Sequence, residues 1–176
     1  MSRPLSHWLL LFALVAMWGS AFALTGIAVR GIDPLPLVAV RLLMAAILLS
    51  GLVVARGQRF PGSGRFWLFA LLISLAGNCV PFTLISFGQI RVPSGLTGIL
   101  MGIMPLATMV MAHFFVAGER LNTIKALGFL LGFSGLVVLI GPEALLQVQG
   151  MGSNLIYLLA ILGGALCYAT NTIIAR

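Results

Sequence analysis

Acidic residues are scarce in this sequence. Its 176 residues include 3 acids against 10 bases, and charged residues make up only 7% of the chain, where soluble domains carry about 25%. So few charged side chains cannot cover the surface of a soluble domain of this length. Hydrophobic residues make up 61%, and this apolar excess also excludes intrinsic disorder. The composition therefore indicates an integral membrane protein.

Cysteine and catalytic residue sets are scarce as well. The two cysteines, Cys79 and Cys167, lie inside apolar runs, which excludes a disulfide-rich secreted scaffold and suits small packed side chains. The sequence has no Ser-His-Asp set, phosphate-binding glycine loop or paired carboxylates. His113 has no partner at the spacing that zinc ligands use. We therefore expect no enzyme, no metal site and no cofactor.

The basic residues do not form a nucleic-acid-binding patch, although the formal charge is +7. Nine of the ten bases lie between apolar runs or at their ends, and Arg41 is the exception. This distribution is typical of the loops of a membrane protein. The expected partner is the lipid bilayer, and no nucleic acid.

Long apolar runs predict six membrane-spanning helices. A bilayer core of about 30 Å needs about 20 helical residues. The runs place the spans at residues 5–29, 35–55, 66–88, 94–116, 124–140 and 155–175, and turn signals rich in glycine and proline separate them. The predicted fold is an all-α, polytopic transmembrane bundle.

The loop charges predict a cytoplasmic N-terminus. With that orientation two bases, Arg30 and Arg91, face outward, and seven face the cytoplasm: Arg3, Arg56, Arg59, Arg65, Arg120, Lys125 and Arg176. Cytoplasmic loops of membrane proteins carry the excess of Lys and Arg. The opposite orientation would place seven bases outside, so it is rejected.

Several short motifs occur in a fixed order along the chain. They are Trp-Gly-Ser-Ala-Phe at 18–22, Val-Arg-Leu-Leu at 40–43 after an Asp-Pro turn, Pro-Ser-Gly-Leu at 93–96, Pro-Leu at 105–106 and Gly-Glu-Arg-Leu at 118–121. A helix with glycines at 128, 132 and 135 follows. This ordered set resembles the EamA-type family of the drug/metabolite transporter superfamily over nearly the whole chain.

The resemblance implies an architecture of two five-helix repeats with inverted topology. Residues 1–142 would form the first repeat, and residues 143–176 a loop and the first helix of a second, incomplete repeat. We expect the sequence to be a fragment, with the missing repeat supplied by further sequence or by a second chain. The resemblance also implies a multi-pass protein of the plasma (inner) membrane. Its expected activity is efflux of small organic metabolites, such as amino acids, by alternating access.

Arg41 is the most informative candidate site residue, because it is an ionisable group inside a predicted span. A guanidinium facing a cavity would bind a substrate carboxylate through two hydrogen bonds. Two structural alternatives stay open. The side chain would otherwise extend to the headgroups or pair with Asp33.

Other polar, aromatic and proline residues lie inside the spans. The predicted substrate-binding residues, besides Arg41, are Trp18, Ser20, Asn78, Tyr168 and Asn171. Packing between helices is the alternative for each. Pro81 and Pro105 would kink their helices and are predicted hinges or packing kinks.

Two further expectations concern helix packing and the membrane boundary. The pairs Gly98 and Gly102, and Gly128 and Gly132, have the four-residue spacing that lets membrane helices approach closely. Gln89 lies near the outer end of its span and is expected at the membrane interface. Both features are interpreted as structural.

Two other function classes stay open. One is a homodimeric transporter of the small multidrug type, which needs a carboxylate inside the membrane for proton exchange. The predicted spans contain no Asp or Glu, so this mechanism is disfavoured. The other is a non-transporting membrane subunit, in which Arg41 would affect stability alone.

Overall fold

The computed structural model describes residues 5–119, 121–140 and 155–175, and every element in these ranges is a helix. The first two helices are α1 (Leu5–Ala28) and α2 (Pro34–Ala55). The third crossing, Gly64–Gly88, consists of α3 (Gly64–Ser74), a π-helical turn η1 (Leu75–Cys79) and α4 (Val80–Gly88). The remaining helices are α5 (Ser94–Met101), α6 (Ile103–Phe115), α7 (Thr123–Ile140) and α9 (Leu155–Ile174).

The helices confirm the predicted all-α polytopic bundle. Five helical segments are long and apolar enough to cross a membrane, and they match the first four predicted spans and the last. The fifth predicted span corresponds to the apolar helix α7. The boundary between the two predicted repeats, at residue 142, lies outside the described residues. Both the repeat assignment and the cytoplasmic N-terminus stay predictions.

Two crossings are interrupted, each about four residues before a proline. Proline has no N–H, and its ring clashes with the carbonyl group four residues earlier. Pro81 therefore disturbs the helix at Gly77, which lies inside the π-helical turn η1. Pro105 disturbs it at Met101, where α5 ends before Gly102 and α6 begins. The predicted helix distortions are confirmed in position, and hinge motion at either proline stays a prediction.

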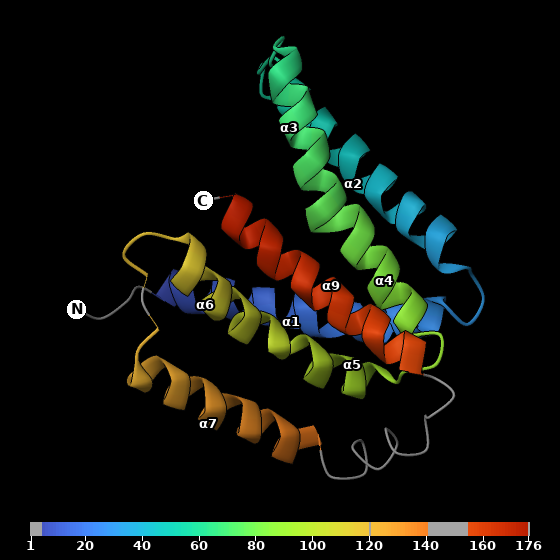
Figure 1. Ribbon diagram of the computed structural model, residues 1–176. Helices are drawn as coiled ribbons and strands as arrows, with labels where there is room; N and C mark the ends of the chain where they lie inside the picture. Colours follow the sequence, from blue (N-terminus) through green and yellow to red (C-terminus); the bar gives the residue numbers. More distant parts are fainter. Residues whose placement is uncertain (1–4, 120, 141–154, 176) are drawn as a thin grey trace.

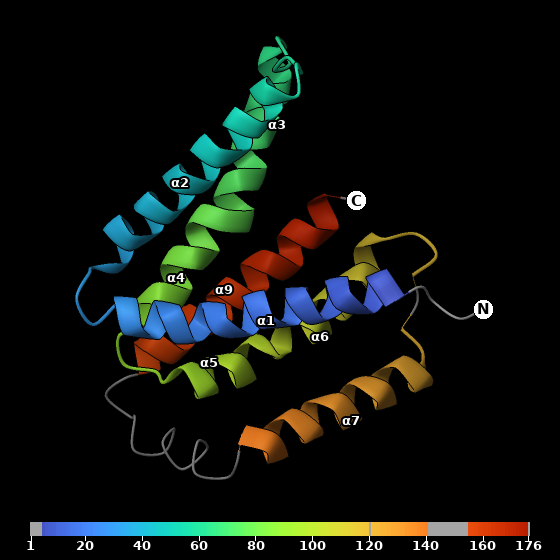
Figure 2. The same cartoon turned by 180° about the vertical axis from the view of Figure 1, so that it is seen from behind.

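Helix α9 occupies the middle of the bundle, although it comes last in the chain. It packs between α4 and α6 and also contacts α5 (Figure 1). Helix α1 crosses the far side, where it contacts α5, while α2 contacts α4 (Figure 2). Helix α7 lies at the edge of the bundle against α5. The helix assigned to the second predicted repeat is thus enclosed by helices of the first.

Glycines let α4 and α9 approach closely. A Cβ atom added to Gly164 would lie 2.8 Å from Ile85 Cγ1, and one added to Gly88 would lie 2.7 Å from the Tyr157 carbonyl oxygen. Small residues serve this role generally between membrane helices. The expectation of close packing at Gly98, Gly128 and Gly132 was wrong, because a Cβ there would meet no other atom within 4 Å in the described parts of the chain.

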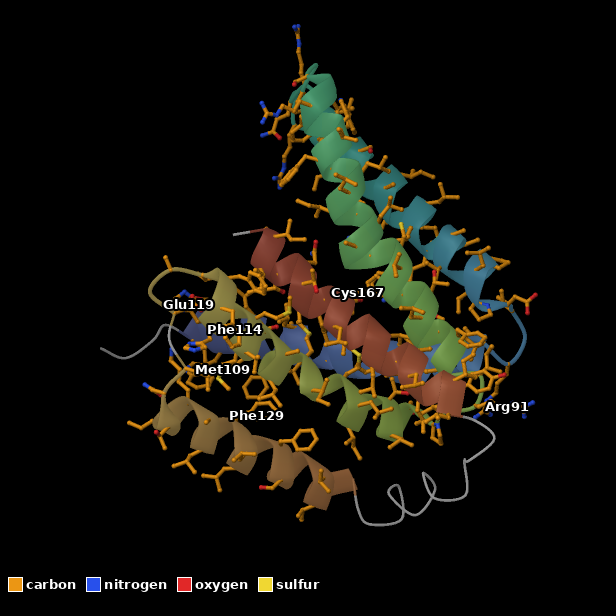
Figure 3. The ribbon with its side chains drawn as sticks, in the orientation of Figure 1. Arg91, Met109, Phe114, Glu119, Phe129 and Cys167 are labelled. Atoms are coloured by element: carbon orange, nitrogen blue, oxygen red, sulfur yellow. The ribbon has the colours of Figure 1, made fainter. Side chains whose placement is uncertain are left out.

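The apolar core lies at one end of the bundle. Its buried members come from α4, the α4–α5 turn, α5 and α9: Ile85, Val92, Leu96, Ile99, Met101, Leu158, Ile161 and Ala165. We call this end the packed end; Arg91, in the turn between α4 and α5, marks it in Figure 3. Towards the other end the α2–α3 hairpin diverges from α9 and α6 (Figure 1). Large apolar side chains cover the outer faces of α1, α2 and α7, as a lipid environment requires.

Candidate functional site

A cavity of about 460 Å³ lies among α1, α2, the interrupted third crossing, the α5–α6 break and α9. This volume falls within the range of small-molecule sites, about 300–1,000 Å³. We call it the central cavity. Its lining consists of Met17, Trp18, Ala21, Phe22, Thr25, Arg41, Gly77, Asn78, Phe82, Ile85, Ser86, Met101, Met104, Tyr168, Asn171 and Thr172.

The structure brings together five of the six predicted substrate-binding residues. They reach the central cavity from four helical segments, α1, α2, η1 and α9: Trp18, Arg41, Asn78, Tyr168 and Asn171. Ser20 is not among the lining residues. Its hydroxyl group donates to the carbonyl oxygens of Ala16 and Met17, at 2.7 and 3.2 Å, within its own helix.

Among the described residues, Arg41 is the one charged residue in the lining of the central cavity. Its guanidinium carbon lies 4.4 Å from the centroid of the Phe82 ring, a cation–π contact. The edge of Tyr168 packs against Phe82 in turn, with ring centroids 6.1 Å apart and planes inclined by 76°. Stacking uses the flat face of the guanidinium, and its N–H groups lie in the plane. Arg41 is therefore held by an aromatic pair while its donors remain available to an acceptor.

Asn171 brings an unmatched acceptor to the same cavity. Its carboxamide packs against Gly77 in the π-helical turn so closely that a Cβ on Gly77 would lie 2.6 Å from Asn171 Cγ. Asn171 Oδ1 is buried and accepts no hydrogen bond from the described residues. Buried polar atoms are nearly always bonded. The lining thus offers a strong donor in Arg41, whereas the Asn171 oxygen is covered by neighbouring atoms.

Sequence reasoning missed most of the apolar lining, although a signal for it exists. Phe82 and Ile85 lie four and seven residues after Asn78, on the same helical face. Phe22 and Thr25 likewise lie four and seven residues after Trp18, on the face of α1 that Trp18 occupies. Extending each polar candidate along its helical face would have found these residues.

The two prolines flank the central cavity without lining it. Pro81 is buried between two lining residues, Gly77 and Phe82. Pro105 lies just after Met104, which lines the cavity together with Met101. Both helix interruptions therefore meet the cavity through residues that precede the prolines.

Gln89 separates the central cavity from a second one. Only 5% of its surface is exposed, so other helices cover it, and its predicted depth at the membrane interface stays a prediction. Its Nε2 donates to the Phe22 carbonyl oxygen at 2.9 Å, and its Oε1 has no partner among the described residues. Phe22 lines the central cavity, whereas Gln89, Arg30 and Arg91 line an outer cavity of about 350 Å³. The hydrogen bond thus joins the walls of the two cavities at the packed end.

Comparison with known proteins identifies relatives of most of this chain. The model of the EamA-like transporter family matches residues 6–141. An uncharacterized inner membrane transporter of Escherichia coli K12, YedA, is 32% identical over 130 residues, which are 73% of this chain and 42% of the relative. An uncharacterized transporter of Buchnera aphidicola is 31% identical over 168 residues, 91% of this chain and 54% of the relative.

A more distant relative is an uncharacterized transporter of Archaeoglobus fulgidus, 25% identical over 139 residues, which are 79% of this chain and 49% of the relative. The chain spans about half the length of the curated relatives it matches. No solved structure matches it.

Proposed function

This chain belongs to the EamA-like transporter family, and from that membership we propose that it forms part of a carrier exporting small organic metabolites from the cytoplasm. Its apolar helices and its inner-membrane relative make it a multi-pass protein of the plasma membrane. The proposed substrates are amino acids, and the proposed mechanism is alternating access. The second repeat of the carrier would come from further sequence or from a second chain.

The observation that carries the proposal is the single guanidinium in a neutral cavity. Arg41 is stacked on Phe82, and the other lining residues carry no formal charge. An ionisable group inside a membrane segment is costly and is normally retained for function. Its natural ligand is a carboxylate, which accepts two parallel N–H bonds from the guanidinium edge.

The remaining groups support an amino-acid ligand. Arg41 is a donor for a carboxylate, and Asn171 would accept from an ammonium group once its buried, unmatched Oδ1 turns towards the cavity. Between them the walls are aromatic and thioether side chains, including Trp18, Tyr168 and Met104. Such walls suit an apolar amino-acid side chain, because thioethers and rings adapt to apolar ligands.

The asymmetry of the bundle supports a mechanism in which the central cavity opens to one side of the membrane at a time. In the predicted orientation the packed end faces outward and the diverging end faces the cytoplasm. The central cavity would then fill from the cytoplasm, and the Gln89–Phe22 contact would close it towards the outside. Release would require that contact to part, and the interrupted helices at η1 and Gly102 supply weakened points for this movement.

Efflux assays on two variants of the same helix test the proposal. Cells expressing the full-length protein are loaded with ¹⁴C-labelled leucine or phenylalanine, and the initial efflux rate is measured. We expect Arg41→Gln to slow efflux about 10- to 100-fold, since a hydrogen bond to a charged group contributes about 1.5–3 kcal/mol. Leu43→Ala, at an exposed position of α2 outside the cavity lining, should retain the rate of the unmodified protein.

Two results would contradict this proposal. If the unmodified protein moves neither amino acid faster than membranes without it, the substrate class is wrong. If Arg41→Gln exports at the normal rate at equal membrane abundance, the guanidinium has a structural role only. The first result would favour the non-transporting subunit, whereas the second would remove Arg41 from the substrate site.

A further inference from the structure

The tip of the α2–α3 hairpin is strongly cationic. Arg56 follows the last residue of α2, Arg59 lies in the connecting loop, and Arg65 lies in the first turn of α3. All three residues are exposed. The sequence has no acidic residue between Asp33 and Glu119, so nothing nearby in the chain balances these charges. We call this segment, residues 56–67, the hairpin tip.

Aromatic residues give the hairpin tip a defined shape. The Trp67 indole N–H donates to the Pro61 carbonyl oxygen at 2.8 Å, which ties α3 to the loop. The Trp67 ring lies 6.1 Å from Phe60 and 5.7 Å from Phe66, the latter in an edge-to-face arrangement at 84°. Tryptophan rings concentrate where headgroups meet the hydrocarbon of a bilayer.

The length of α2 places the hairpin tip at that same depth. Its 22 residues rise about 33 Å, close to the thickness of a hydrocarbon core of about 30 Å. Because α2 begins directly after Asp33, its far end emerges at the opposite headgroup layer with the arginines. The hairpin also diverges from the other described helices (Figures 1 and 2), so they leave its tip uncovered.

A groove of about 400 Å³ runs along α3 from the hairpin tip. Ser63 and Arg65 line its polar end, and Phe66, Leu68, Phe69 and Leu72 line the rest. Positions 65, 69 and 72 recur at helical spacing. The groove therefore begins at a cation in the headgroup layer and continues as an apolar strip into the hydrocarbon, which is the pattern of a phospholipid.

We propose that the hairpin tip and this groove bind an anionic phospholipid. The lipid phosphate lies among Arg56, Arg59 and Arg65, and one acyl chain lies along Phe69 and Leu72. Each arginine near the membrane surface raises the affinity for an anionic lipid surface about fivefold. Three arginines without acidic neighbours select such a lipid over a zwitterionic one. This site is separate from the central cavity and does not depend on the substrate proposed above.

Quenching of Trp67 by brominated lipids tests the proposal in the intact membrane protein. Trp8→Phe and Trp18→Phe leave Trp67 as the one tryptophan of this chain. The protein is placed in phosphatidylcholine nanodiscs in which the fraction of dibrominated phosphatidylglycerol, or of dibrominated phosphatidylcholine, is raised stepwise. We expect brominated phosphatidylglycerol to quench Trp67 to a given extent at a fraction at least about fivefold lower than brominated phosphatidylcholine requires.

Replacing the three arginines by glutamine should abolish this preference. Arg30→Gln with Arg91→Gln, which removes two cations from the opposite end, is the matched control and should preserve it. Circular dichroism verifies that each variant is folded. Equal quenching by both lipids in the parent protein would overturn the proposal, and so would an unchanged preference in the folded triple variant.

Discussion

The contact between α4 and α9 makes a sharp prediction about stability. In Gly164→Ala the new methyl group would lie 2.8 Å from Ile85 Cγ1 and 3.2 Å from the Pro81 carbonyl oxygen. Carbon atoms in good contact are about 3.5–4.0 Å apart, so the first distance is short by about 0.7 Å. Ile85 is buried and branched at Cβ, so it has little freedom to rotate away. The helices must therefore separate.

The expected loss is about 1–3 kcal/mol in the free energy of unfolding, the usual cost of overpacking a core. Alanine also gains up to about 1 kcal/mol over glycine in a helix interior. Gly128→Ala in α7 isolates that gain, because a Cβ at Gly128 meets no other atom within 4 Å in the described residues. The difference between the two variants thus measures the packing cost alone.

Reversible unfolding in mixed micelles, followed by circular dichroism, measures both variants. Gly164→Ala should unfold more easily than Gly128→Ala by about 1–3 kcal/mol. Equal stability of the two variants would refute the reasoning, because it would mean that α4 and α9 do not pack through Gly164. Gly88→Ala, at the other close contact of this interface, should likewise have a lower free energy of unfolding than Gly128→Ala.

Three further predictions concern the cavity walls. Gln89→Met should change the free energy of unfolding by less than about 1 kcal/mol, because it removes one hydrogen bond and one unmatched acceptor together. Gln89→Glu buries a charge, so in the same unfolding assay its free energy of unfolding should fall by about 3 kcal/mol or more. Gly77→Ala should displace the Asn171 carboxamide, and a double-mutant cycle with Asn171→Ala should show a coupling of about 0.5–3 kcal/mol; additive losses would contradict the contact. Pro105→Ala should restore the helix across Gly102. We expect the variant to be more stable to heat and to export at least about tenfold more slowly. Unchanged efflux would show that the interruption is not a hinge.

The positions of the helices were predictable because the membrane imposes them. Backbone groups must be satisfied within each crossing, so uncharged runs of sufficient length become helices. Asp33-Pro34 and Pro93 then begin the next helices, α2 and α5, where the sequence indicates. Arg41, Asn78 and Asn171 were identifiable for a related reason, since polar side chains inside such runs need partners.

The contacts between helices were less predictable, because a spacing rule does not say which face is buried. Gly128 and Gly132 have the expected four-residue spacing, yet both are exposed on α7. Close approach occurs instead at Gly88 and Gly164, which share no short motif and lie on helices far apart in the sequence. The burial of Gln89 was not predicted, because its place near the helix end does not show that its side chain bonds Phe22 of another helix.

The central place of α9 also fixes an order of assembly. The helix is synthesised after every element that it touches, and α5, α6 and α7 separate it in the chain from α4. Until it enters the membrane, lipid chains must occupy the groove between α4 and α6 and cover Gly77 and Gly88. Contacts between distant segments form slowly, because the chain between them must first be ordered. Docking of α9 is therefore a late event within this part of the chain, in which α9 displaces lipid and adds its wall to the cavity.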